Sequence, residues 1–117
     1  MTVTIYHNPK CGTSRTGLEA LQARGHAPEV VEYLKVGWSE AQLADLFKRM
    51  GVKPRDLLRT KGTPAEELGL TDAGVGDAEI LRAMARHPIL VERPIVVAPN
   101  GVFLCRPASR LEAALAP

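Results

Sequence analysis

The sequence has little cysteine, few aromatic residues and almost no excess charge. Its 117 residues include only two cysteines, Cys11 and Cys105, too few for the disulfide framework that staples small secreted domains. The formal net charge is +2, so composition gives no argument for binding to nucleic acid or to a membrane surface, and we expect neither partner. Any anion-binding site must therefore be built locally from particular side chains.

Long apolar runs and metal-ligand spacings are also missing. No apolar stretch approaches the length of a membrane span, and the N-terminus lacks the layout of a signal peptide, so we expect a cytoplasmic protein. The three histidines and two cysteines are scattered, which predicts neither a metal site nor a tightly bound cofactor. A hydrophobic content of 45% is typical of globular proteins, and the length predicts a single domain over residues 1–117.

What the chain does contain is strand and helix patterns at both ends, with helices between them. The predicted elements begin with a strand over 3–6, a helix ending at Gly25 and a parallel strand over 29–33. Four helices follow, at 39–51, at 54–58, at a start marked by a capping box at 63–66, and at 77–86. The chain then forms a hairpin of 95–97 and 102–104 and a last helix over 109–115. This order is typical of an α/β, thioredoxin-like fold, a mixed four-stranded sheet with a central helical insert.

A polar turn, residues 7–15 with the sequence His-Asn-Pro-Lys-Cys-Gly-Thr-Ser-Arg, joins the first strand to the first helix. Cys11 lies there at the start of the helix, with Thr13 or Ser14 as the expected N-cap. Unpaired N–H groups and the helix dipole favour an anion at this position, either a thiolate or a bound oxyanion. The polar neighbours are those of an exposed turn, which favours a reactive thiol over a structural one.

Three neighbours of Cys11 are candidates for supporting a thiolate. Arg15 opposes the helix dipole in the first turn, which a nearby anion would relieve, although a solvated side chain explains it equally well. Ser14 either donates a hydrogen bond to the thiolate or, more economically, caps the helix. His7 either helps to lower the pKa of the thiol or is a hydrogen-bonded structural residue. Cys105 ends an apolar run, which favours a packed strand residue over a resolving thiol.

Three arginines, Arg59, Arg93 and Arg106, lie where predicted strands or helices end. Singly, each is best interpreted as a surface charge. Arg93 and Arg106 bracket the predicted hairpin, however, and an antiparallel return brings its two ends together. In a thioredoxin-like fold the proline that starts this strand, commonly in cis, faces the active cysteine. Guanidinium groups match tetrahedral oxyanions with two parallel hydrogen bonds, so the pair favours an oxyanion site beside Cys11.

Separated segments of the chain strongly resemble the bacterial arsenate reductases coupled to glutathione and glutaredoxin, the ArsC family. They are residues 7–15, 57–59, 66–70, 87–90, 93–97 and 104–107, and they span nearly the whole chain in the family's order. The resemblance implies that Cys11 attacks arsenate and that Arg59, Arg93 and Arg106 hold the oxyanion. It also implies glutathione as co-substrate and glutaredoxin as the partner that completes reduction to arsenite. Ser14 replaces the second cysteine of a dithiol motif, so no local thiol resolves the adduct.

Three other functions are alternatives to this one. A phosphatase-type arsenate reductase needs a Cys-x5-Arg loop, and Gly17 stands at that position, which disfavours this mechanism. Spx-like transcription regulators share the Arg-Pro-Ile segment at 93–95 but commonly carry a Cys-x-x-Cys switch that is absent here. A related thiol oxidoreductase acting on another substrate is the strongest alternative, because the motifs do not specify arsenate.

Overall fold

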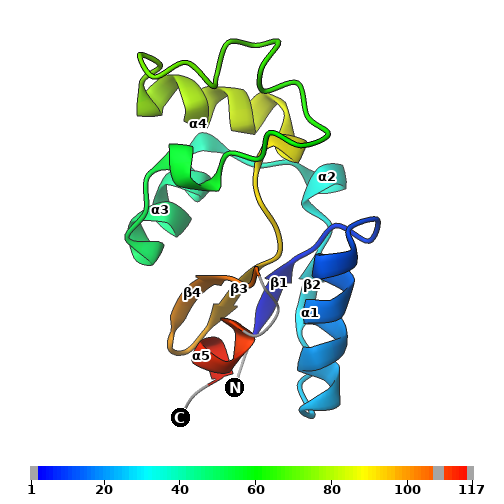
Figure 1. Ribbon diagram of the computed structural model, residues 1–117. Helices are drawn as coiled ribbons and strands as arrows, with labels where there is room; N and C mark the ends of the chain where they lie inside the picture. Colours follow the sequence, from blue (N-terminus) through cyan, green and yellow to red (C-terminus); the bar gives the residue numbers. More distant parts are fainter. Residues whose placement is uncertain (1–2, 107–109, 116–117) are drawn as a thin grey trace. The chain divides into compact units, whose positions relative to one another are not determined.

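The computed structural model describes residues 3–106 and 110–115, and the chain divides into two compact units. The first unit is built from both ends of the chain, up to Val36 and from Arg93 onward. Its elements are β1 (Thr4–Tyr6), α1 (Gly12–Ala23), β2 (Glu29–Val31), α2 (Tyr33–Val36), β3 (Ile95–Ala98), β4 (Gly101–Leu104) and α5 (Leu111–Leu115) (Figure 1). The second unit, Gly37–Glu92, is the predicted helical insert.

The four strands form one mixed sheet in the order β2-β1-β3-β4. β1 and β2 are parallel, as expected for two strands joined through helix α1, while β3 runs antiparallel to both β1 and β4. The β3–β4 register pairs Ile95 with Leu104 and Ala98 with Gly101, so Pro99 and Asn100 form the turn. The thioredoxin-like arrangement predicted from the sequence is therefore confirmed, including the hairpin at its Asn-Gly signal.

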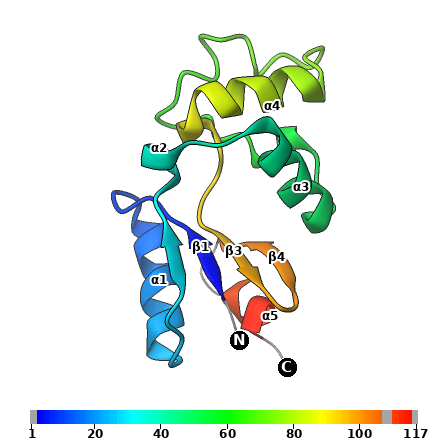
Figure 2. The same ribbon diagram turned by 180° about the vertical axis from the view of Figure 1, so that it is seen from behind.

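Helices α1 and α5 cover the same face of this sheet (Figures 1 and 2). Alternate strand residues point to this face, and Ile5 of β1 pairs directly with Val96 of β3. Helix residues Leu21 and Leu111 pack against them, and all four side chains are almost completely buried. Burial of this apolar surface holds α1 against the strands and so fixes where the start of α1 lies.

The second unit packs α3 (Glu40–Met50) and α4 (Asp77–Arg86) together with two 3-10 helices, η1 (Pro54–Leu57) and η2 (Pro88–Leu90). Ser39 caps α3 by accepting a hydrogen bond from the backbone N–H of Gln42, at 3.0 Å. An isolated antiparallel bridge pairs Leu58 with Val91. This bridge brings the segments after η1 and η2 side by side, each of which carries a charged residue discussed below.

Three local expectations were wrong. The segment 63–66 starts no helix: Thr63 bonds back to the carbonyl oxygen of Arg59 at 2.7 Å, and the chain makes successive turns through Gly69, whose φ is 73°. The second strand ends at Val31, and Tyr33 instead begins the four-residue helix α2, where its ring is buried. The N-cap of α1 is neither Thr13 nor Ser14, as described below. The last predicted helix begins at Leu111, and Ser109 lies outside the described residues.

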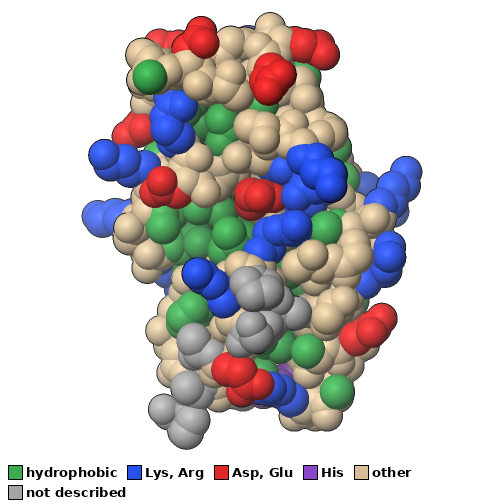
Figure 3. Space-filling view, viewed as in Figure 1, with side chains coloured by type: hydrophobic (Ala, Val, Ile, Leu, Met, Phe, Trp, Pro, Cys, Tyr) green, Lys and Arg blue, Asp and Glu red, His purple; other side chains and the backbone are tan. Residues whose placement is uncertain are grey.

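The surface carries charges of both signs. On the face shown in Figure 3, Lys and Arg side chains are interspersed with Asp and Glu, as the small net charge leads one to expect. Within the described residues no helix is long and apolar enough to cross a membrane. Over the same ranges, His, Cys, Asp and Glu side chains form no cluster of three that could hold a metal ion.

Candidate functional site

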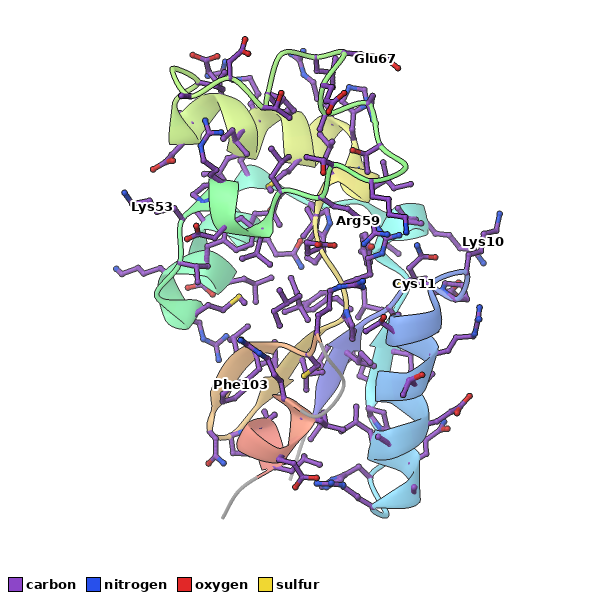
Figure 4. The ribbon with its side chains drawn as sticks, viewed as in Figure 1. Lys10, Cys11, Lys53, Arg59, Glu67 and Phe103 are labelled. Atoms are coloured by element: carbon purple, nitrogen blue, oxygen red, sulfur yellow. The ribbon has the colours of Figure 1, made fainter. Side chains whose placement is uncertain are left out.

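Cys11 is itself the N-cap residue of α1. Its backbone is extended, with φ −93° and ψ 122°, and its carbonyl oxygen accepts the first helical hydrogen bond from Arg15 N at 3.0 Å. Its own N–H donates to the carbonyl oxygen of Asn8 at 3.0 Å, which closes the turn before the helix. The thiol is therefore fixed at the positive end of α1, a position that favours the ionised form. Figure 4 shows Cys11 at this junction.

The hydroxyl of Ser14 holds the turn rather than capping the helix. Ser14 Oγ lies 2.7 Å from Nδ1 of His7 and accepts a hydrogen bond from the backbone N–H of Asn8 at 3.0 Å. All three residues are buried. The side-chain amide oxygen of Asn8 in turn accepts from Lys10 N at 3.0 Å. The residues before Cys11 are thus tied to the first turn of α1, which the sequence expectation of a Ser14 helix cap did not foresee.

Arg93 and Arg106 lie together beside the thiol, as the hairpin predicted. Arg106 Nη1 donates to the carbonyl oxygen of Arg93 at 3.0 Å and lies 3.6 Å from Cys11 Sγ. Arg93 is buried, and its Nε and Nη1 find no hydrogen-bond partner among the residues that the structure describes. Buried donors without partners are costly, so this guanidinium is arranged to receive acceptor atoms from outside the chain.

These surroundings lower the pKa of Cys11 to about 7, from an ordinary value of 9.0. Burial acts the other way and favours the neutral thiol. It is outweighed by the backbone N–H of Ser14 and by the side chains of Arg93 and Arg106, which stabilise the negative sulfur. A substantial fraction of Cys11 is therefore thiolate near neutral pH. The sequence did not indicate the role of the backbone N–H of Ser14. Almost every residue carries a backbone N–H, so the sequence gives no signal for which of them stabilises the thiolate.

The two remaining thiolate-support candidates, Arg15 and His7, hydrogen-bond to other residues of the turn. Arg15 Nη1 donates to the carbonyl oxygen of Pro9 at 3.0 Å, and its side chain is exposed. Burial lowers the pKa of His7; the nearby carboxylate of Glu32 raises it and the charge of Arg15 lowers it further, with burial having the largest effect. The described hydrogen bond of the His7 ring is to the hydroxyl of Ser14, so His7 supports the turn and does not contact Cys11 Sγ through this bond.

Arg59 belongs to the second unit and forms an ion pair there. Its Nη1 lies 2.9 Å from Oε1 of Glu92, and its Nε donates to the carbonyl oxygen of Lys61 at 3.1 Å. The backbone bridge between the two segments sets up this pair, with Arg59 N donating to Leu90 O at 2.7 Å. Glu92 was not singled out in the sequence, where nothing marks it as a partner of a residue 33 positions away.

Cys105 is a packed residue. It is completely buried in the core of the first unit, its N–H donates to the carbonyl oxygen of Pro94 at 3.0 Å, and it forms no disulfide. Burial raises the pKa of its thiol to about 11, although the charge of Arg110 opposes this shift. A neutral, buried thiol is a poor nucleophile, in keeping with the sequence interpretation of Cys105.

Comparisons with known proteins converge on one family. The sequence model of the ArsC family matches residues 6–114. The chain is 53% identical over 106 residues to the arsenate reductase ArsI2 of Synechocystis, covering 91% of this chain and 76% of that protein. It is 54% identical over 108 residues to an arsenate reductase of Rhizobium meliloti, covering 92% and 77%. Its fold is similar to that of an arsenate reductase from Vibrio cholerae, with a TM-score of 0.93, 40% identity and 98% of each chain covered.

Proposed function

Because the chain belongs to the ArsC family, we propose that it reduces arsenate to arsenite with Cys11 as the nucleophile. The observation that carries the proposal is the buried side chain of Arg93, which lies beside a thiol whose pKa is lowered to about 7 and has two donor atoms without a partner among the described residues. A tetrahedral oxyanion supplies the acceptor atoms that these donors lack. Proteins of this family named as arsenate reductases, at 53% and 54% identity, support arsenate as that oxyanion.

The first step is attack of the Cys11 thiolate on arsenic(V). A sulfur–arsenic bond forms, one arsenic–oxygen bond breaks, and the oxygen leaves as water after taking up protons. Arg93 and Arg106 hold the remaining oxygens and neutralise their charge while the bond forms. Arg106 also contacts the sulfur, at 3.6 Å, so it orients both reacting groups. Arg59 is proposed as a third oxyanion ligand on the strength of the family resemblance, and binding there would compete with its ion pair to Glu92.

The second step needs two electrons, which the chain does not supply. Position 14 is a serine, and Cys105 is buried and protonated, so neither provides a second thiol. We propose glutathione and glutaredoxin as the donors: their two thiols end as a mixed disulfide, arsenic(V) becomes arsenic(III), and Cys11 returns to its starting form. Net, one arsenate and two thiols give one arsenite, one disulfide and one water.

The test is arsenate-dependent NADPH oxidation in the presence of glutathione, glutathione reductase and glutaredoxin. We expect activity in the wild type and in Cys105→Ala, and none in Cys11→Ser. Arg93→Lys keeps the charge but loses the planar fork, and we expect a kcat/KM for arsenate lower by about tenfold to a hundredfold. Arg82→Lys, at an exposed position in the second unit, is the matched control and should leave kcat/KM unchanged.

Two results would overturn parts of this proposal. If the partner proteins are active and the wild type shows no arsenate-dependent oxidation, the substrate is another one, as for the related thiol oxidoreductase considered above. If activity appears with glutathione alone and glutaredoxin adds nothing, the arsenate assignment stands and the partner is wrong. Loss of activity in Cys105→Ala, with folding unchanged, would reassign Cys105 as a resolving thiol.

A further inference from the structure

A cavity of about 200 Å³ lies beside the turn that carries Cys11, within the first unit. Its lining residues are Asn8, Pro9, Lys10, Glu32, Leu34 and Lys35. The turn before α1 forms one wall and α2 with the residue preceding it forms the other. Pro9, Leu34 and the methylene groups of the lysines give it a mainly apolar lining. None of these residues takes part in the arsenate chemistry proposed above.

The charged groups of this cavity form a matched set. Lys10 and Lys35 are exposed, and Lys35 Nζ lies 3.5 Å from Oε1 of the partly buried Glu32. The residues that line the cavity thus carry two ammonium groups and one carboxylate, and one of the ammonium groups is already paired with the carboxylate. A free α-amino acid group, which carries one carboxylate and one ammonium, is complementary to this arrangement: its carboxylate meets the lysines and its ammonium meets Glu32.

We infer that this cavity binds the γ-glutamyl end of glutathione, an inference that rests on the proposed function. The γ-glutamyl group keeps both its α-carboxylate and its α-ammonium, whereas the cysteine of glutathione carries neither. A cavity of about 200 Å³ is smaller than the roughly 300 Å³ at which pockets begin to enclose whole drug-sized ligands, so it takes one end of the tripeptide. The cysteinyl and glycyl parts remain outside.

The cavity is close enough to Cys11 for the thiol of a glutathione bound in it to reach the Cys11 sulfur. Lys10 lines the cavity and is the immediate neighbour of Cys11, so their Cα atoms are about 3.8 Å apart. An extended tripeptide spans roughly 10 Å, enough to pass from the cavity over Lys10 to the sulfur. Figure 4 labels both residues on the same turn. Glutathione held in this way presents its thiol to the arsenic bound on Cys11.

Binding can be measured without arsenate or partner proteins. S-methylglutathione, which cannot react, is titrated into the full chain, and backbone amide shifts are followed by NMR. We expect saturable shifts at residues 8–10 and 32–35. Replacing one lysine, in Lys10→Gln or Lys35→Gln, should raise the Kd about two- to fivefold, the usual effect of losing an exposed ion pair. Lys48→Gln, on the exposed face of α3, is the matched control and should not change the Kd.

Fragments of glutathione show which end of the tripeptide binds in the cavity. γ-Glutamylglycine should produce the same shifts as S-methylglutathione, and S-methylcysteinylglycine, which lacks the γ-glutamyl group, should produce none at residues 32–35. If all three ligands instead produce similar shifts, and these shifts disappear when salt is raised, the lysines attract the ligands nonspecifically and the inference is overturned. Saturable shifts located elsewhere, or no shifts with S-methylglutathione, would overturn it as well.

Kinetics separate this inference from the proposed function. In the coupled assay, Lys10→Gln and Lys35→Gln should raise the KM for glutathione by about the same two- to fivefold and leave the KM for arsenate unchanged. The strongest influences that lower the pKa of Cys11 come from Ser14, Arg93 and Arg106, so the pH midpoint of Cys11 alkylation should also stay near 7 in both variants. An active enzyme whose glutathione KM is unaffected would refute the cavity alone, whereas absence of arsenate reduction would refute the proposed function.

Discussion

The contact between Arg106 and the thiol leads to a quantitative prediction for Arg106→Gln. Arg106 Nη1 lies 3.6 Å from Cys11 Sγ, and the guanidinium is among the groups that lower the pKa of the thiol to about 7. Glutamine keeps a polar side chain, but it is shorter and carries no positive charge. The thiolate then loses a charged hydrogen bond while the neutral thiol loses little, so the pKa of Cys11 must rise.

The size of the effect follows from the strength of that contact. Hydrogen bonds to charged groups contribute about 1.5–3 kcal/mol, and a sulfur acceptor at 3.6 Å belongs at the lower end. A loss of about 1.4 kcal/mol changes the thiolate fraction tenfold wherever the thiol form dominates. We therefore expect alkylation of Cys11 at about pH 6 to slow about tenfold in Arg106→Gln.

Iodoacetamide alkylation measured from acid to alkaline pH tests this directly. A Cys105→Ala background leaves Cys11 as the only thiol in the chain. At high pH, where Cys11 is ionised in both proteins, the two rates should converge, which separates a change in pKa from a change in access. Arg110→Gln is the control, because Arg110 is exposed and its charge acts on Cys105. Equal rates for Arg106→Gln and its parent at low pH would refute the stabilisation of the thiolate by Arg106.

Three further predictions concern stability, each measured by urea unfolding. The pKa of Cys11 in the folded protein, about 7, is below its ordinary value of 9.0. Ionisation of Cys11 therefore stabilises the fold above pH 9, and this stabilisation is lost as the pH falls through 7. Relative to Cys11→Ser, the free energy of unfolding of the wild type should rise by about 2–3 kcal/mol between pH 7 and pH 9. Leu21→Ala empties a fully buried core position and should cost about 2–5 kcal/mol, against little for exposed Gln22→Ala. Ser39→Ala removes the cap of α3 and should cost about 1 kcal/mol.

The parts of the fold that sequence predicts well have strong local signals. The Asn-Gly pair specifies the hairpin turn, and the register that follows pairs Ile95 with Leu104. Continuing this ladder outward, Cys105 N bonds to Pro94 O, and Arg106 comes to lie opposite Arg93. The juxtaposition of these two arginines could therefore be predicted from their symmetric positions about one turn.

The parts that failed depend on context that a short pattern does not contain. Thr63 has the spacing of a capping box, but its hydroxyl bonds back to Arg59 O, and Gly69 adopts a positive φ that turns the chain within a few residues. Tyr33 continues an alternating pattern, yet its ring is buried in a short helix. At Thr63 a competing local turn replaces the predicted helix, and at Tyr33 tertiary packing overrides a weak preference for strand.

The arrangement around Cys11 explains why the hydroxyl of Ser14 does not cap α1. A helix start leaves backbone N–H groups without partners, and the usual remedy is a hydroxyl or carboxylate at the N-cap. Here the N-cap is Cys11 itself, and as a thiolate its sulfur is the anion that the Ser14 N–H stabilises. The hydroxyl of Ser14 is then free to hold His7 and Asn8, and so to fix the turn that positions the sulfur. One residue thus serves the site twice, through its backbone for charge and through its side chain for geometry.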